Sequence, residues 1–298
     1  MRPVRTDLAM EHCDSGDLPG VKVAAWEENG VSVTEVRVET DEGARITEKP
    51  VGRYVTLEKP RGQDGPEIRL AVSEMLGEEI MRMLPDGDGP ALVIGLGNRQ
   101  VTPDSLGPRT VDGTLVTRHL FEALPQSVDG RMSSVCAVAP GVLGVTGVET
   151  MELVRSVTAA VKPRVVVCVD SLAARSWRRV GCAVQLTDTG IQPGSGVGNH
   201  RMALTRETLG TPVLALGVPT VIYAATLARD AFESLSDAGE EELDALAGEL
   251  LGGEMSDLIV TPREIDRMVS EVASVLSGAI NRAFHPGLSA MEMEEMKG

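Results

Sequence analysis

The chain has 298 residues, of which 42% are hydrophobic and 2% aromatic, and its formal net charge is −16 at pH 7. The hydrophobic fraction is that of a globular protein, and the negative charge argues against nucleic acid as a direct partner because phosphate backbones would repel it. With no apolar signal segment at the N-terminus and no run of about 18 apolar residues, the sequence predicts a cytoplasmic protein with no membrane partner.

The N-terminal part predicts β structure followed by one helix. Residues 21–60 alternate apolar and polar side chains, which is typical of an antiparallel hairpin region. Apolar residues then recur at helical spacing over residues 67–84. We therefore expect a β-rich N-terminal appendage, joined by a helix to the rest of the chain.

A repeating strand–helix pattern follows. Strand-like apolar runs occur at residues 91–95, 133–138, 164–169, 182–187 and 212–217, and helical runs near 110–123, 148–161 and 219–234. Alternation of this kind indicates a mainly parallel sheet with helices on both faces. The predicted fold is therefore α/β, with residues 8–298 forming a single domain.

The C-terminal part contains an insertion, a long helix and a tail. The segment at about 236–256 is acidic and predicts a surface insertion. Thr261, Pro262 and Glu264 have the spacing of an N-cap, a first-turn proline and a capping-box glutamate, so a helix is expected from there to about Phe284. We expect the acidic, Met-rich tail, at about 285–298, to be mobile.

Two aspartates follow predicted strands. Asp104 comes shortly after the strand at 91–95 and a Gly-x-Gly-Asn turn, and Asp170 directly follows the strand at 164–169. In a parallel sheet both would lie in the crevice beyond the carboxyl ends of the strands, where α/β proteins bind ligands. Two close carboxylates share a proton, so that one activates a water and the other polarises a carbonyl. The residues alone leave two alternatives open: ligation of a divalent metal together with His119 or His200, and structural capping of local turns.

Other catalytic motifs are incomplete. The third glycine of a dinucleotide-binding fingerprint is replaced by Gln100, and the chain has neither a P-loop nor a Gly-x-Ser-x-Gly elbow. Asp188 begins an Asp-Thr-Gly tripeptide, which we interpret as a chance match to the all-β aspartic proteases, although Asp188 follows a strand and is expected near the same crevice. The four cysteines form no Cys-x-x-Cys pair and are interpreted as reduced thiols: Cys13, Cys136, Cys168 and Cys182.

Eight motifs, in order along nearly the whole chain, resemble the germination protease family of endospore-forming bacteria. They are RTDLAME at 5–11, GLGNRQVTPDSLGP at 95–108, TRHL at 117–120, APGVLGVTGVET at 139–150, DSLAARS at 170–176, DTGIQPGSGVGN at 188–199, GVPTV at 217–221 and VTPREID at 260–266. The resemblance implies an endopeptidase that degrades small acid-soluble spore proteins in the developing forespore or spore core. It also implies a fold like that of hydrogenase maturation proteases, a homotetramer, and no cofactor.

The resemblance also implies specific site residues. Asp104 and Asp170 match the family's candidate catalytic aspartates, and self-cleavage of a zymogen in the Thr-Asp-Leu-Ala segment corresponds to the bond between Asp7 and Leu8, so that residues 1–7 form a propeptide. We expect two loops, at 139–150 and 188–199, to flank the cleft, because their glycines let backbone N–H groups approach a substrate carbonyl. The expected cleft-lining residues are Asn98, Thr146, Asp188, Gly194, Ser195, Gly196, Gly198 and Asn199. A rival from another class is a non-catalytic protein that binds spore proteins.

Overall fold

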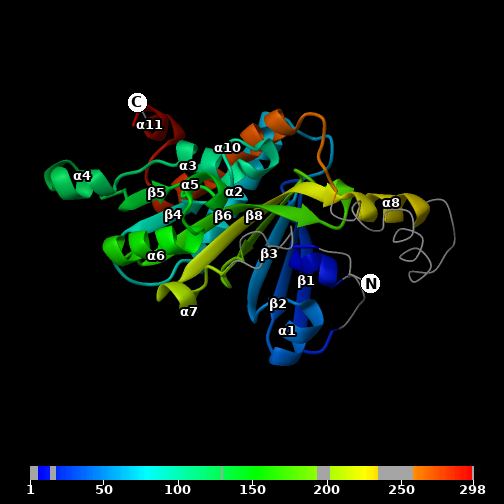
Figure 1. Ribbon diagram of the computed structural model, residues 1–298. Coiled ribbons are helices and arrows are strands. Elements are labelled where there is room, and N and C mark those ends of the chain that lie inside the picture. The colour runs from blue at the N-terminus through cyan, green and yellow to red at the C-terminus, as the bar shows by residue number, and fades with distance from the viewer. Residues whose placement is uncertain (1–5, 14–17, 129, 193–201, 234–257, 297–298) are drawn as a thin grey trace.

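The computed structural model describes residues 6–13, 18–128, 130–192, 202–233 and 258–296 (Figure 1). Within these residues, nine strands form one sheet in the order β1-β2-β3-β7-β8-β6-β4-β5, with β9 paired to β8. The strands are β1 (Val21–Glu28), β2 (Val31–Val38), β3 (Gly52–Glu58), β4 (Ala91–Gly95), β5 (Val135–Val138), β6 (Val165–Ala174), β7 (Ala183–Thr187), β8 (Val213–Tyr223) and β9 (Ile259–Val260).

Most of the described helices lie between consecutive strands in the chain. They are α1 (Asp41–Thr47), α2 (Pro66–Met83), α3 (Leu106–Gly113), α4 (Arg118–Ala123), α5 (Leu143–Thr146), α6 (Thr150–Val161), α7 (Arg206–Leu209), α8 (Ala224–Glu233), α10 (Ile265–Phe284) and α11 (Ala290–Glu295). Short 3-10 helices are η1 (Ala9–His12), η2 (Thr102–Asp104), η3 (Pro125–Ser127) and η4 (Trp177–Arg179). None of the described helices is long and apolar enough to cross a membrane.

The sheet has a parallel half and an antiparallel half. Strands β5, β4, β6 and β8 are parallel, whereas β1, β2, β3 and β7 run antiparallel to their neighbours. The predicted hairpin region is confirmed, but it continues the same sheet through β3 and β7. Strand β7 departs from the expected parallel pattern because only residues 175–182 separate it from β6, and a parallel crossover needs a dozen residues or more.

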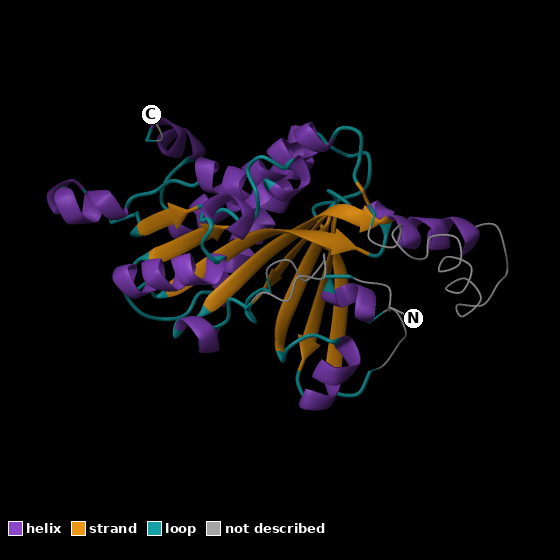
Figure 2. Cartoon of the chain, in the orientation of Figure 1, coloured by secondary structure: helices purple, strands orange, loops and turns teal. Residues whose placement is uncertain are grey.

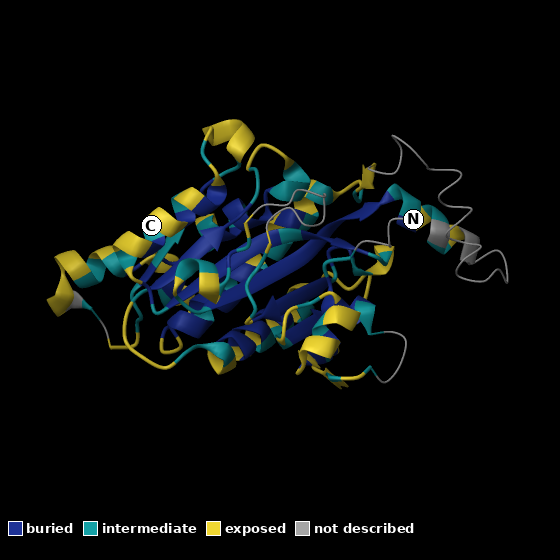
Figure 3. Ribbon diagram, turned by 60° about the horizontal axis from the view of Figure 1, so that its bottom comes forward, coloured by how far each residue is buried: buried dark blue, intermediate teal, exposed yellow. Residues whose placement is uncertain are grey.

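Helices cover both faces of the parallel half, which confirms the α/β class (Figure 2). On one face, α2 and α10 pack against Val167, Val169 and Leu216. On the other, α6 packs against Val166 and Cys168. Figure 3 shows these strands buried between the two helix layers. Burial on both sides explains why the strands read as continuous apolar runs.

Two strands extend past the carboxyl end of β4. Strand β4 ends at Gly95, which pairs with Val169, whereas β6 continues to Ala174 and stays paired with β8. The sequence-predicted ends at residues 169 and 217 were therefore too early. Beyond Val169, the edge of β6 that faces β4 has no strand partner among the described residues. This free edge positions the site.

Three predictions about helices need correction. The helix expected at 110–123 is two helices, because Asn281 of α10 accepts from Leu115 N–H (2.8 Å) and donates to the Gly113 carbonyl (3.0 Å), which ends α3. Helix α10 starts at Ile265 with Glu264 as N-cap, so the expected capping box at Thr261 is not formed, although the helix ends at Phe284 as predicted. In the tail expected to be mobile, Ser289 and Glu292 form a capping box that begins α11. The acidic insertion at 236–256 lies outside the described residues.

Candidate active site

A glycine-rich turn places η2 against β6. Gly97 has φ +108°, and a Cβ there would lie 2.0 Å from the Asp104 carbonyl oxygen. Similarly, a Cβ on Gly107 would lie 2.6 Å from the Val169 carbonyl oxygen. Only glycine permits both close approaches, and η2 consequently lies beside β6 and β8.

Asp104 is held by the turn that precedes it. Its Oδ2 accepts the Asn98 N–H at 2.8 Å, and the Asn98 side chain in turn accepts the Gln100 N–H at 3.0 Å. The N-cap of α3 is Ser105, so Asp104 does not cap that helix. The structural role open to Asp104 is therefore to close the preceding turn, not to cap a helix. In this position Asp104 is half-buried at the carboxyl end of β4.

Asp170 lies inside β6, one residue beyond the level at which β4 ends. It is 6% exposed, pairs with Gly217 of β8, and accepts the Ser171 N–H at 2.8 Å. The prediction that Asp170 follows its strand was wrong, and so was the alternative that it caps a turn. The two aspartates nevertheless come from adjacent segments, η2 and β6, at the same edge of the sheet.

The N-terminal segment, residues 6–12, docks on the free edge of β6. Asp7 N–H donates to the Ala173 carbonyl (3.0 Å), and Ala173 N–H donates back to Asp7 Oδ2 (2.9 Å). The Asp7 carbonyl accepts from Lys49 Nζ (3.0 Å) and Gln185 Nε2 (3.3 Å). Leu8 is fully buried in a cluster that includes Leu172. Since side chains alternate along a strand, Leu172 and Asp170 share one face of the sheet, so the bond between Asp7 and Leu8 lies on the face that carries Asp170.

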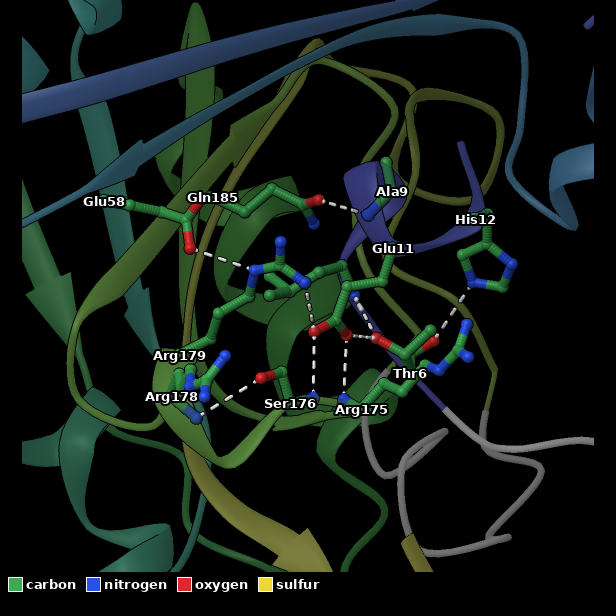
Figure 4. A network of polar contacts seen from close by, with 11 residues as sticks. Thr6, Ala9, Glu11, His12, Glu58, Arg175, Ser176, Arg178, Arg179 and Gln185 are labelled. Carbon is green, nitrogen blue, oxygen red and sulfur yellow. Dashed lines mark hydrogen bonds and ion pairs between the residues drawn. The ribbon is translucent and has the colours of Figure 1, made fainter. Parts of the chain in front are cut away.

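Glu11 anchors this segment from inside the protein (Figure 4). Its carboxylate accepts from the amides of Arg175 (2.8 Å) and Ser176 (3.1 Å), from Arg179 Nη1 (2.8 Å), and from the Thr6 hydroxyl. Burial by itself would lower the pKa of Arg179, but hydrogen bonds and negative charge from Glu11 and Glu58 outweigh it and raise that pKa. Glu11 is only 3% exposed, so the contact is a buried ion pair completed by backbone donors.

The structure disperses some of the other predicted residues. Asp188 follows β7 at the level of the amino-terminal part of β8, because β7 is antiparallel, and its Oδ1 accepts the Arg53 N–H at 2.8 Å. Thr146 ends α5 in the loop after β5, where its hydroxyl bonds within the loop. His119 lies on α4, two residues after Thr117, whose N–H donates to the Val135 carbonyl at the start of β5. His119 is therefore at the opposite end of the parallel strands from Asp104.

The remaining predicted residues are Gly194, Ser195, Gly196, Gly198, Asn199 and His200, and they lie outside the described residues. Sequence reasoning missed Glu11, Lys49 and Gln185. Gln185 alone has a local signal, because it is a polar residue within the apolar strand β7.

Three of the described cysteines disfavour catalysis by a thiol. Burial raises the pKa of the Cys136, Cys168 and Cys182 thiols, and a reactive cysteine needs a lowered one. Among the residues that the structure describes, no group of three or more His, Cys, Asp or Glu side chains is arranged to hold a metal ion.

Known proteins resemble this chain over most of its length. A family model described as germination protease matches residues 4–242. A germination protease of Clostridium perfringens strain 13 is 42% identical, over 97% of this chain and 97% of its own. A germination protease of Priestia megaterium is 37% identical, over 95% of this chain and 94% of its own. A solved [NiFe] hydrogenase maturation protease, HycI from Thermococcus kodakarensis, covers 67% of this chain and 98% of its own at 17% identity and a TM-score of 0.36.

Proposed function

Since the chain belongs to the germination protease family, we propose that it is an endopeptidase that degrades small acid-soluble spore proteins during spore germination. The observation that carries the proposal is the position of Asp104 and Asp170. They reach one edge of the sheet from η2 and β6, next to a docked peptide segment that contains the bond between Asp7 and Leu8.

The proposed reaction is hydrolysis with water as the nucleophile. The ionised member of the aspartate pair takes a proton from the water, and the protonated member hydrogen-bonds the carbonyl oxygen of the bond being cut. The water oxygen bonds to the carbonyl carbon and gives a tetrahedral intermediate. Its C–N bond then breaks, and the leaving amine takes the proton that the aspartate pair received from the water. The two roles belong to the pair, since a shared proton makes its titration a joint property.

We propose that the same site also processes the chain itself, as a zymogen. The bond between Asp7 and Leu8 lies on the Asp170 face of the sheet, and its carbonyl oxygen already has two donors, on Lys49 and Gln185. After the cut, Glu11 would keep the new N-terminus attached through Arg175, Ser176 and Arg179. We propose further that the enzyme works as a homotetramer in the cytoplasm of the forespore.

The proposal is tested by incubating the purified chain with a small acid-soluble spore protein and mapping the products by mass spectrometry. We expect cuts after acidic residues.

A parallel reaction with a chelator addresses the metal-assisted alternative, which requires complete loss of cleavage and its return with added metal. An intact spore protein that co-purifies with the chain would instead support the non-catalytic binding alternative.

A further inference from the structure

Both the backbone carbonyl and the side-chain carboxylate of Asp7 accept hydrogen bonds from the body of the protein. Its carbonyl oxygen has two side-chain donors, Lys49 Nζ at 3.0 Å and Gln185 Nε2 at 3.3 Å, and its carboxylate accepts the Ala173 N–H at 2.9 Å. The donors come from three separate places in the chain: the segment after α1, strand β7 and strand β6.

Two of these interactions involve the acidic side chain itself: the Ala173 N–H on its carboxylate and the positive charge of Lys49. Lys49 interacts electrostatically with the negative charge of Asp7, and also with Glu48 and Glu11. It is partly buried, so its charge is screened less than that of an exposed lysine. The edge of β6 that faces β4 supplies backbone donors and acceptors to whatever lies along it, which is how extended peptides add to a sheet edge.

We propose that Lys49, Gln185 and the Ala173 amide form an acidic-residue subsite that binds the Asp or Glu preceding the bond cut in a protein substrate. In the unprocessed chain Asp7 fills this subsite, and cleavage after Asp7 empties it while Glu11 keeps the following residues in place. The inference rests on the proposed function. It makes Lys49 a specificity-determining residue of that reaction, and Gln185 a positioning residue that holds the peptide backbone.

Gln185 ties the subsite to the aspartate pair through the sheet register. Gln185 of β7 lies opposite Gly217 of β8, and Gly217 lies opposite Asp170 of β6. Residues directly opposite in neighbouring strands point to the same face of a sheet. The side chains of Gln185 and Asp170 therefore share a face and a row of the sheet.

The test compares two quenched-fluorescence peptides with the sequence of residues 5–11, one with Asp and one with Asn at the position of Asp7. The self-processed chain should show a higher kcat/KM for the Asp peptide. In Lys49→Gln, kcat/KM for the Asp peptide should fall by about 10- to 100-fold, since interactions with charged groups contribute strongly. The Asn peptide loses only the Lys49 hydrogen bond to its carbonyl oxygen, so its kcat/KM should fall less. Lys49→Arg retains the charge and should keep most of the preference.

Two further variants sharpen the result. Gln185→Glu keeps an acceptor for the Ala9 N–H, which Gln185 Oε1 accepts at 2.7 Å, but places a negative charge beside the bound acid; it should also lose the preference. Lys22→Gln removes the same charge from a side chain that is 72% exposed on β1, and should leave the preference unchanged.

The outcomes distinguish failure of the acidic-residue subsite from failure of the proposed function. If the wild-type chain cuts peptides and Lys49→Gln and Gln185→Glu retain its preference for Asp, the subsite is wrong and the proposed function stands. If the folded wild-type chain cuts neither peptide nor spore protein, the proposed function fails and the subsite fails with it.

Discussion

Asp170 and Gln185 lie in one row of the sheet, on either side of Gly217. Strands lie about 5 Å apart in a sheet, so the two Cα atoms are roughly 10 Å apart. Leu172 folds over the glycine, since a Cβ on Gly217 would lie 2.4 Å from Leu172 Cδ1. Leu172 in turn packs in the cluster that buries Leu8. This row therefore connects a proposed catalytic carboxylate with the bond proposed to be cut.

The turn before Asp104 can be tested with Gly97→Ala. A Cβ there would clash with the Asp104 carbonyl oxygen at 2.0 Å, in a backbone conformation that alanine rarely adopts. We expect a loss of at least about 1 kcal/mol in the free energy of unfolding, and about 100-fold in kcat/KM because Asp104 is displaced. Gly130→Ala is the control, because a Cβ there meets nothing within 4 Å and Gly130 lies outside the loops expected to flank the cleft. Unchanged activity in a folded Gly97→Ala variant would show that the position of Asp104 is not critical.

The proposed self-processing predicts one defined product. The full chain, incubated alone, should acquire a new N-terminus at Leu8, read by N-terminal sequencing and intact mass. The reason is the enclosure of the bond between Asp7 and Leu8 on the Asp170 face of the sheet. A mature N-terminus at any other residue would contradict the assignment of residues 1–7 as the propeptide.

Glu11 should anchor the N-terminal segment before and after processing. Glu11→Ala leaves Arg179 and two amides without their buried acceptor, and removing one member of a buried ion pair costs about 3–5 kcal/mol. Urea unfolding should report this loss, and hydrogen exchange should show less protection at Arg175 and Ser176. Glu27→Ala, on the exposed strand β1, is the control and should change neither quantity. Equal stability of the two variants would contradict the anchoring role.

The preference for acidic residues should depend on pH through Lys49. Burial lowers the pKa of Lys49 from its usual 10.5, against the opposing charges of Asp7, Glu48 and Glu11. Below the lowered pKa the ammonium is charged and the preference is present; as pH rises through that value, the proton is lost and the preference falls. Lys49→Arg stays charged and should keep the preference at alkaline pH. A wild-type preference that is constant up to pH 10.5 is incompatible with this role of Lys49.

Much of the fold could be predicted from the sequence, because apolar runs mark buried strands directly. Strand β4 was predicted with its observed bounds, and α10 with its observed end. The direction of β7 could not be read from its own residues, since it is set by the short connection from β6. The extension of β6 past Asp170 was also missed, because it depends on pairing with β8 and not on local hydrophobicity.

The candidate site was predictable only in part. Strand ends and motif resemblance predicted Asp104 and Asp170 as candidates, and the resemblance added the bond between Asp7 and Leu8. Lys49 and Gln185 are far from these residues in the chain, and only the sheet register and the docked N-terminal segment bring them to Asp7. Glu11 was part of a quoted motif, but its role as a buried anchor depends on Arg179 and the end of β6.

The most direct test of the account is cleavage of a small acid-soluble spore protein by Asp104→Asn and Asp170→Asn, measured as kcat/KM beside the free energy of unfolding. Acid–base catalysis contributes about 10²- to 10⁴-fold, so each variant should lose at least about 100-fold. Asp88→Asn, at an exposed position before β4, should cut at the wild-type rate. If either folded variant, Asp104→Asn or Asp170→Asn, cleaves at the wild-type rate, the proposal that the two aspartates act as a catalytic pair is contradicted.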